Sequence, residues 1–180
     1  MSATRQLIRD TIRTVPDWPS PGIRFRDITP VLQQPQVFRQ VIDVLEERYR
    51  DAGLAVIAAV DARGFLFAAP LADRLGIALV PVRKKGKLPF HTISQDYDLE
   101  YGSASVELHL DAVKPGEKVL VIDDLIATGG TMMAVCQLIR KLGGEVCEVA
   151  ALVNLPDLKG AERLQAAGFA VFGICEFEGE

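Results

Sequence analysis

The chain has 180 residues, of which 49% are hydrophobic and 24% charged, and its formal net charge at pH 7 is -4. This length is typical of one globular domain with its own core, and the mild acidity argues against nonspecific binding to nucleic acid. No apolar run is long enough to span a bilayer, no secretory leader opens the chain, and its three cysteines lack metal-ligand spacing, so we expect a cytoplasmic protein with reduced thiols.

The N-terminal part is expected to differ in organisation from the rest. Ser2–Val15 has apolar residues at helical spacing, which predicts a helix, and the prolines that follow favour loop or extended chain. Gly22–Ile28 alternates crudely, and Pro35–Ala52 predicts a helix with one apolar stripe. Because this part lacks a regular alternation of strands and helices, we expect about residues 1–35 to form a small hood within a single domain of residues 1–180.

The first predicted sheet strand is Ala55–Val60, an apolar run of the kind buried in a parallel sheet. Arg63 follows it closely, just before a predicted helix over Phe65–Leu75. Ligands of open α/β sheets bind at the carboxyl ends of strands, and the planar fork of an arginine suits phosphate oxygens. The alternative left open is that Arg63 pairs with a nearby carboxylate at the edge of the sheet.

A second predicted strand, Ala78–Val82, leads into a cationic loop that contains Arg83, Lys84 and Lys87. Clustered cations usually mark a solvated loop, but at a strand end they can also stabilise a departing polyanion. The next tract, Phe90–Gly102, is polar and irregular, and we expect it to be a mobile lid.

The most informative stretch follows the turn at Lys114–Glu117. Val119–Ile122 is an unbroken apolar run that predicts a strand buried on both faces, and Asp123 and Asp124 follow it at once. The two carboxylates would repel a bare phosphate, but they suit sugar hydroxyls or a developing positive charge.

A loop of small residues comes next and ends at the start of a helix predicted over Met132–Gly144. Glycines let the backbone approach a ligand, and consecutive N–H groups and the helix N-terminus attract anions. We therefore interpret the site as one for a sugar phosphate, with the sugar over the acids; the alternative is an ordinary strand–helix turn with solvated acids. The loop residues concerned are Ala127, Thr128, Gly129, Gly130 and Thr131.

The rest of the chain continues the alternation, with a strand over Glu145–Leu155, a turn at Pro156–Gly160, a helix over Ala161–Gly168 and a strand over Ala170–Cys175. Alternating strands and helices predict an α/β fold with a mostly parallel central sheet flanked by helices.

Five strings in this chain resemble motifs of the type I phosphoribosyltransferases. VIDDLIATGGT resembles the ribose-phosphate signature of that family, and GIRFRD, ARGFLF, VRKKGKLP and LEYG occur in family order across nearly the whole chain. Several separate strings in register are far more specific than any one of them. The resemblance implies transfer of ribose 5-phosphate from phosphoribosyl pyrophosphate (PRPP) to a nitrogen base.

The resemblance also implies a base site. Phe25 would stack on a purine, the backbone at Arg26 would read its edge, and Leu158 would cover its other face. Alternatively, Phe25 is a core residue and Leu158 a packing contact at a helix entry. Arg24 stands where related sequences usually carry an aliphatic residue.

At the sugar, the resemblance implies that Asp123 and Asp124 hold the ribose hydroxyls and that residues 127–131 anchor the 5-phosphate. Arg63 and Lys87, together with Mg²⁺ carried on PRPP, would neutralise the pyrophosphate. No protein-held metal is expected.

Two lid residues complete the set. The resemblance implies that Glu100 handles a purine proton and that Tyr101 belongs to the pyrophosphate region. Neither His91 nor His109 is assigned to catalysis.

The expected reaction is adenine plus PRPP giving AMP and pyrophosphate, carried out by a homodimer without nucleic-acid or membrane partners. One rival is a transferase that acts on hypoxanthine, guanine or xanthine, against which the Phe25 segment favours adenine. The other is a non-enzymatic regulator that senses PRPP or a nucleotide and binds nucleic acid, against which the acidic balance and the complete set of lid residues argue.

Overall fold

The computed structural model describes residues 2–98 and 103–179 of the chain. Its elements follow one another in this order: α1 (Ala3–Thr11), β1 (Arg13–Pro16), β2 (Arg24–Asp27), α2 (Thr29–Gln33), α3 (Pro35–Tyr49), β3 (Val56–Val60), α4 (Gly64–Leu75), β4 (Ala78–Lys84), β5 (Thr92–Asp98), β6 (Ser103–His109), β7 (Lys118–Ile126), α5 (Gly130–Lys141), β8 (Glu145–Asn154), the short 3-10 helix η1 (Pro156–Leu158), α6 (Gly160–Ala166) and β9 (Val171–Glu176).

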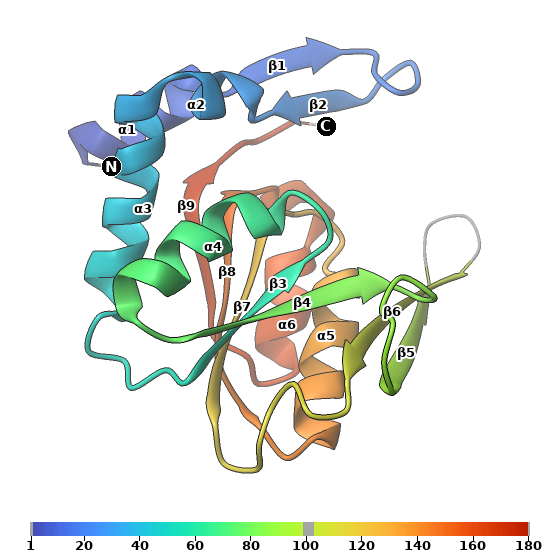
Figure 1. The fold of residues 1–180 in the computed structure, drawn as a ribbon. Coiled ribbons are helices and arrows are strands. Elements are labelled where there is room, and N and C mark those ends of the chain that lie inside the picture. The colour runs from blue at the N-terminus through green and yellow to red at the C-terminus, as the bar shows by residue number, and fades with distance from the viewer. Residues whose placement is uncertain (1, 99–102, 180) are drawn as a thin grey trace.

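A seven-stranded sheet in the order β5-β6-β4-β3-β7-β8-β9 forms the centre of the molecule (Figure 1). The five strands from β4 to β9 in that order are parallel neighbours, whereas β6 runs antiparallel to β4 and β5 antiparallel to β6. The prediction of a mostly parallel α/β sheet is confirmed.

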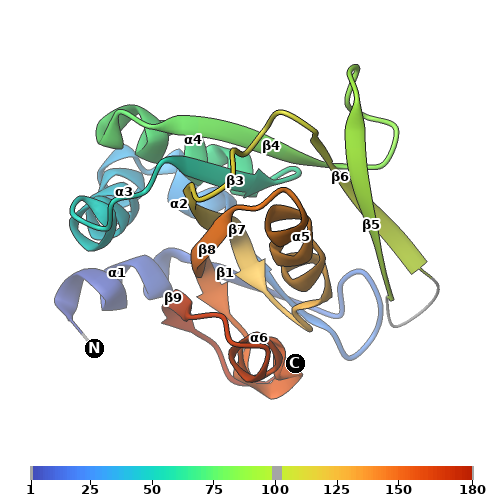
Figure 2. The same cartoon turned by 90° about the horizontal axis from the view of Figure 1, so that it is seen from below.

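Helices cover both faces of this sheet (Figure 2). The first half of the core joins α1, α3 and α4 to Ile57 of β3 and Leu120 of β7, and the second half joins α5 and α6 to Val56 and Val119 of the same strands. Successive residues of a strand point to opposite faces of the sheet. Because helices cover both faces, neighbouring residues such as Val56 and Ile57 are both buried. This two-sided burial explains why these strands are continuous apolar runs. Within the described ranges, no helix is long and apolar enough to cross a membrane.

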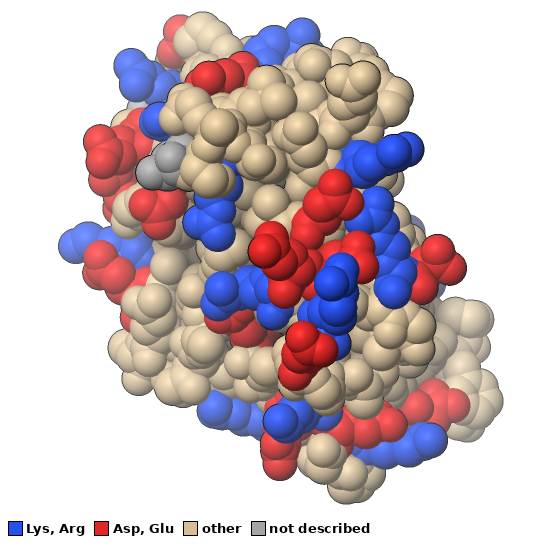
Figure 3. All heavy atoms as spheres, turned by 90° about the vertical axis from the view of Figure 1, so that its left-hand side faces the viewer, with Lys and Arg blue, Asp and Glu red and all other residues tan. Residues whose placement is uncertain are grey.

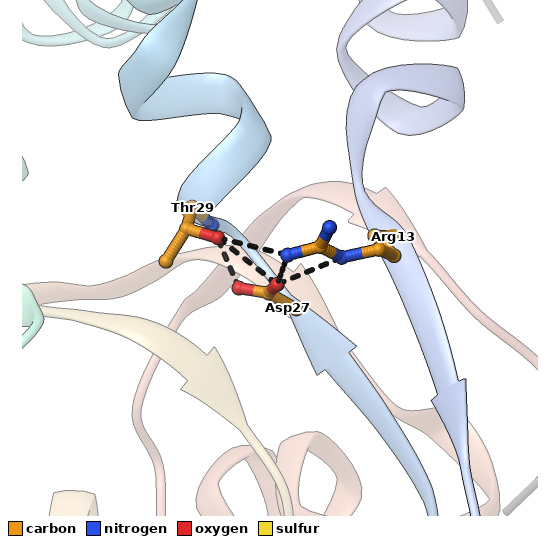
Figure 4. Close-up of polar contacts among 3 residues, drawn as sticks. All are labelled: Arg13, Asp27 and Thr29. Atoms are coloured by element: carbon orange, nitrogen blue, oxygen red, sulfur yellow. Dashed lines mark hydrogen bonds and ion pairs between the residues drawn. The ribbon is translucent and has the colours of Figure 1, made fainter.

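The N-terminal part contains a two-stranded antiparallel sheet that the sequence interpretation missed. The helix predicted to reach Val15 ends at Thr11, and β1 pairs with β2 so that Arg13 lies opposite Asp27. The Asp27 carboxylate accepts hydrogen bonds from the Arg13 guanidinium, and from the backbone N–H and hydroxyl of Thr29 at 2.9 Å each (Figure 4). Asp27 therefore fixes the pairing of β1 with β2 through a contact with Arg13, 14 residues away in the chain, and the start of α2 through a local turn to Thr29.

The expected irregular lid also begins as a strand. β5 pairs along its length with β6, from Thr92 opposite His109 to Asp98 opposite Ser103. Ile93 and Tyr97 pack against the core beneath, while the residues between them are polar. The prediction was wrong here because only two apolar residues mark this strand's buried side, too few to stand out in a polar tract.

Candidate active site

The candidate site lies at the carboxyl edge of the sheet. Because β3, β4, β7 and β8 are parallel, their ends meet along this edge. Four connections leave the sheet there: residues 61–63, 85–91, 127–129 and 155–159. Sequence segments up to about 100 residues apart thereby become neighbours.

The two acids lie inside β7 rather than after it, which corrects the predicted strand end at Ile122. The ladder to β8 continues with Asp123 opposite Ala151 and Ile126 opposite Asn154. Backbone pairing does not depend on side-chain polarity, so a strand can continue beyond its last apolar residue. The consequence is burial, since the Asp124 side chain is only 3% exposed.

Burial sets the protonation of this pair. Desolvation first, and then repulsion from Asp124, raises the pKa of Asp123 to about 8. Desolvation also raises the pKa of Asp124, but there the Arg63 guanidinium opposes it. Asp123 Oδ1 accepts the backbone N–H of Asp124 at 2.8 Å. Asp123 is therefore the member that holds its proton more tightly, and Asp124, beside Arg63, is the member that more readily carries the negative charge.

This arrangement predicts a pH-dependent gain in stability for Asp123→Asn. In the unfolded chain the carboxyl titrates near 3.8, so between about pH 4 and pH 8 the folded parent holds more protons than the unfolded one. Parent stability therefore falls as pH rises through this window, whereas an amide has no proton to lose. We expect the variant to melt at least about 4 °C higher than the parent at pH 9, with a much smaller difference at pH 5. Differential scanning fluorimetry from pH 4 to pH 9 measures this, and parallel melting curves would contradict it.

Arg63 links the acid pair to the N-terminal part of the chain. Its Nε lies 2.7 Å from Asp124 Oδ2, and its guanidinium carbon lies 5.3 Å from the centroid of the Phe25 ring. The alternative in which Arg63 pairs with a carboxylate is therefore what the structure shows, and that carboxylate is itself a predicted site residue. Arg63 remains 42% exposed and accessible to a ligand.

Gly64, the glycine that follows Arg63 at the carboxyl end of β3, makes this approach possible. A Cβ at position 64 would lie 2.8 Å from the carbonyl oxygen of Ile122 and 3.2 Å from Asp123 Oδ1. Only glycine lets the β3–α4 connection lie directly against the acid pair.

The small-residue loop forms a hollow beside the acids. Asp123 and the residues from Leu125 to Met132 line a space of about 90 Å³. Gly129 has a φ of +80°, and α5 begins at Gly130, one residue before Thr131. The hollow combines free N–H groups with the positive end of a helix, which suits one phosphate-sized anion.

The cationic loop is braced by two acids that the sequence interpretation missed. Arg83 Nε lies 3.1 Å from Asp61 Oδ2, and Arg83 Nη1 donates to the carbonyl of Lys87 at 3.1 Å. The buried Glu107 of β6 accepts the backbone N–H groups of Lys87 and Leu88, both at 2.9 Å. In the sequence, Glu107 stands out only as a charged residue within the alternating, strand-like run Ala104–Leu110.

The side chains of Lys84 and Lys87 are exposed at this edge. Arg83 is thus partly engaged in holding the loop, whereas the two lysines are accessible to an anion.

A larger pocket of about 260 Å³ lies between the N-terminal part and η1. Residues from four segments of the chain line it, among them Ile23, Arg24, Thr128, Leu158, Phe177 and Gly179. Phe25 packs edge-on against Trp18, with ring centroids 4.4 Å apart, and lies under Arg63. The Arg26 side chain is buried and turns toward the C-terminal tail. The structure thus brings Leu158 and the small-residue loop of residues 127–131, called the phosphate loop below, to one pocket.

Two predicted residues, Glu100 and Tyr101, lie outside the described residues. In the described part of the chain, no group of three or more His, Cys, Asp or Glu side chains could hold a metal ion. Asp123 and Asp124 are nevertheless oxygen ligands of the kind that Mg²⁺ prefers, and Mg²⁺ is commonly bound by one or two carboxylates together with substrate phosphates. The residues present therefore fit a Mg²⁺ ion that arrives with a phosphorylated substrate.

A buried acid pair beside an anion hollow is the arrangement of an enzyme that handles a sugar phosphate, and comparison with known proteins agrees. Residues 27–172 match the Phosphoribosyl transferase domain family. Since this match covers more than half of the chain, the protein belongs to that family.

Within the family, the chain is similar to adenine phosphoribosyltransferases. It is 60% identical to the one from Methylibium petroleiphilum, covering 97% of this chain and 89% of that protein. Among solved structures, the enzyme from Thermoanaerobacter pseudethanolicus matches with a TM-score of 0.92 and 46% identity, covering 96% of this chain and 99% of the other. The Saccharomyces cerevisiae enzyme, complexed with D-2,5-dideoxy-2,5-imino-altritol 1,6-bisphosphate and adenine, matches with a TM-score of 0.91 and 35% identity, covering 97% of this chain and 100% of that one.

Proposed function

We propose that this chain transfers ribose 5-phosphate from PRPP to adenine, giving AMP and pyrophosphate, and so serves purine salvage. The observation that carries the proposal is its similarity, over 97% of its length, to a relative named for this activity. The acid pair beside the anion hollow supports it independently. The activity is a pentosyl transfer, a form of glycosyltransferase chemistry.

The central chemical problem is breaking the bond between the anomeric carbon and pyrophosphate. The ribose ring becomes positive as the pyrophosphate departs, so the enzyme must stabilise charges of opposite sign a few ångströms apart. Asp123 and Asp124 hold the ribose hydroxyls and lie near the positive ring. A charged Asp124 in a buried site stabilises that ring more than it would in water.

The 5-phosphate is anchored in the hollow formed by residues 127–131. Backbone N–H groups and the N-terminus of α5 favour its negative charge, and the hydroxyls of Thr128 and Thr131 can donate to its oxygens. Because this end of the substrate does not react, its binding serves to fix the position of the anomeric carbon.

The leaving pyrophosphate is neutralised by cations. Arg63, Lys84 and Lys87 supply positive charge at the sheet edge, and Arg83 shapes the loop that carries the lysines. Mg²⁺ carried by PRPP would add charge neutralisation at the phosphates, next to Asp123 and Asp124.

Adenine is placed between the N-terminal part and η1. Phe25 stacks on the base, the backbone at Arg26 reads its edge, and Leu158 covers the other face. Residues 1–35 act as the base-binding hood of a single domain that spans residues 1–180. Glu100 manages the purine proton, and Tyr101 lies near the pyrophosphate. Closure of the tract that contains them excludes water.

The family resemblance further implies a homodimer, which light scattering on the purified protein can test. A cytoplasmic location is part of the proposal, because Cys136, Cys147 and Cys175 are all free thiols, as a reducing compartment favours.

A role as a nucleic-acid-binding regulator receives little support. Such a protein needs a basic face, but on the face that carries α1 and α3 the acidic and basic side chains are intermixed (Figure 3). Arg74 pairs there with Asp43 and Glu46, and Arg48 pairs with Glu148.

The deciding experiment is a base screen. Purified protein is mixed with PRPP, Mg²⁺ and one of adenine, hypoxanthine, guanine or xanthine, and the mononucleotide and pyrophosphate are quantified. We expect AMP from adenine at a rate at least about a hundredfold above any other base, since the edge of the base is read by buried hydrogen bonds. Faster turnover of another base would reassign the substrate. Absence of turnover with every base, with nucleic acid retained at moderate salt, would favour the regulator.

A further inference from the structure

We propose that the C-terminal residues 177–179 form one wall of the base pocket and that Asp157 is a positioning residue that anchors this wall. The inference rests on the proposed function, because it requires that adenine binds in the pocket between the hood and η1. The proposal gives a substrate-binding role to residues 177–179, which follow the last strand and lie outside the matched family region that ends at residue 172.

The tail leaves the sheet and crosses to the hood. β9 ends at Glu176, and the Phe177 N–H still donates to the carbonyl of Asn154 at 3.1 Å. Beyond that point the described residues of the tail run toward β2 (Figure 1). Phe177 and Gly179 line the pocket together with Ile23 and Leu158. The tail therefore closes a side that the hood and η1 leave open.

On the η1 side, the tail is held by one hydrogen bond. The backbone N–H of Gly179 donates to Asp157 Oδ2 at 2.7 Å. Asp157 lies in η1 directly before Leu158, the residue proposed to cover the base. The Asp157 carboxylate thus joins Gly179 to the segment that carries the proposed base contact.

On the hood side, the tail is held by Arg26. Its Nη2 donates to the carbonyls of Glu178 at 3.2 Å and Gly179 at 2.8 Å, and its guanidinium lies 4.7 Å from the centroid of the Phe177 ring. Arg26 is only 5% exposed, and desolvation lowers its pKa. Loss of the tail carbonyls would leave a buried cation with fewer acceptors, so the positions of the tail and of β2 are coupled.

Arg24 covers the tail from outside. A Cβ at Gly179, which has a φ of +78°, would lie 2.9 Å from Arg24 Nη1, so the guanidinium rests directly on this glycine. Arg24 also lines the pocket. Arg24 is thereby part of the same wall.

This geometry predicts a specific kinetic signature for Asp157→Ala. Loss of the bond to Gly179 frees the tail and loosens the base pocket, while the acid pair and the phosphate hollow keep their own contacts. We expect KM for adenine to rise about tenfold, the value of one charge-assisted hydrogen bond, with kcat and KM for PRPP within about twofold of the parent. Asp157→Asn retains an acceptor oxygen, and we expect it to restore KM for adenine to within about threefold.

The matched control is Glu162→Ala, which removes an exposed acid in the first turn of α6 and should change none of the three constants. A second variant lacks residues 179–180 and keeps Asp157, so it removes the donor instead of the acceptor. Its KM for adenine should rise as much as in Asp157→Ala, because both variants lose the hydrogen bond between Gly179 and Asp157. This variant decides the question if Asp157→Ala fails to fold.

An unchanged KM for adenine in either folded variant would overturn the inference. So would an equal rise of both KM values, which would indicate general loosening of the site. Measurements on the parent enzyme distinguish failure of the proposed function from failure of the role assigned to the tail. If the parent makes no AMP, the proposed function fails; if the parent is active and Asp157→Ala behaves like it, only the assignment of the tail fails.

Discussion

Replacement of both acids of β7, in the double variant Asp123→Asn with Asp124→Asn, is expected to lower kcat at least about a thousandfold. The amides keep the size of the side chains but carry no negative charge to stabilise the positive ribose. The burial of the pair makes the loss large, because a charge in a low-dielectric site interacts more strongly than one in water. Single-turnover production of AMP from saturating PRPP and adenine measures the effect on the chemical step.

A surface control separates this electrostatic effect from a general loss of charge. The double variant Asp43→Asn with Glu46→Gln changes the same number of carboxylates on α3, where both side chains pair with Arg74. It should keep parental turnover. Binding of AMP to the acid-pair variant, measured by calorimetry, should persist, because the phosphate hollow is built mainly from backbone. Unchanged turnover in the acid-pair variant would remove these acids from the mechanism.

The parts of the site that could be predicted are those where local sequence and strand direction suffice. β3 and β7 are continuous apolar runs because both faces of each are covered, and polar residues directly after such runs must lie at the carboxyl edge. That reasoning selected Arg63, Asp123 and Thr128, and the structure brings them to one edge of the sheet.

The parts that could not be predicted depend on contacts between distant segments. The pairing of β1 with β2 needs Arg13 to meet Asp27, and the shape of the cationic loop needs Glu107 to reach Lys87. Local periodicity contains neither contact. The role of the C-terminal tail could not be predicted for the same reason, because it depends on contacts with Arg26, which is distant in the chain.

Steric requirements between loops are the hardest to read from a sequence, and Gly160 is the strongest example. It begins α6 and lies under the phosphate loop. A Cβ at position 160 would lie 2.1 Å from the Ala127 carbonyl oxygen and 2.7 Å from the backbone nitrogen of Gly129. Its φ lies outside the left-handed region, so the need for glycine comes from this contact alone.

We therefore expect Gly160→Ala to push the phosphate loop outward by about 1 Å and to lower kcat/KM for PRPP at least about a hundredfold, since displacements of this size misalign the reacting atoms. The displacement also disturbs packing, so the melting temperature should fall. Steady-state kinetics with varied PRPP and calorimetric binding of AMP measure the functional part of the effect.

Gly76→Ala is the control that separates backbone strain from steric overlap. Gly76 caps α4 at a φ of +64°, but a Cβ there would meet nothing within 4 Å. Alanine at position 76 is expected to destabilise the fold by about 1–2 kcal/mol and to leave KM for PRPP unchanged. If both variants lose stability equally and neither loses affinity for PRPP and AMP, the phosphate does not bind in the hollow that Gly160 supports, and the 5-phosphate site has to be sought elsewhere along the sheet edge.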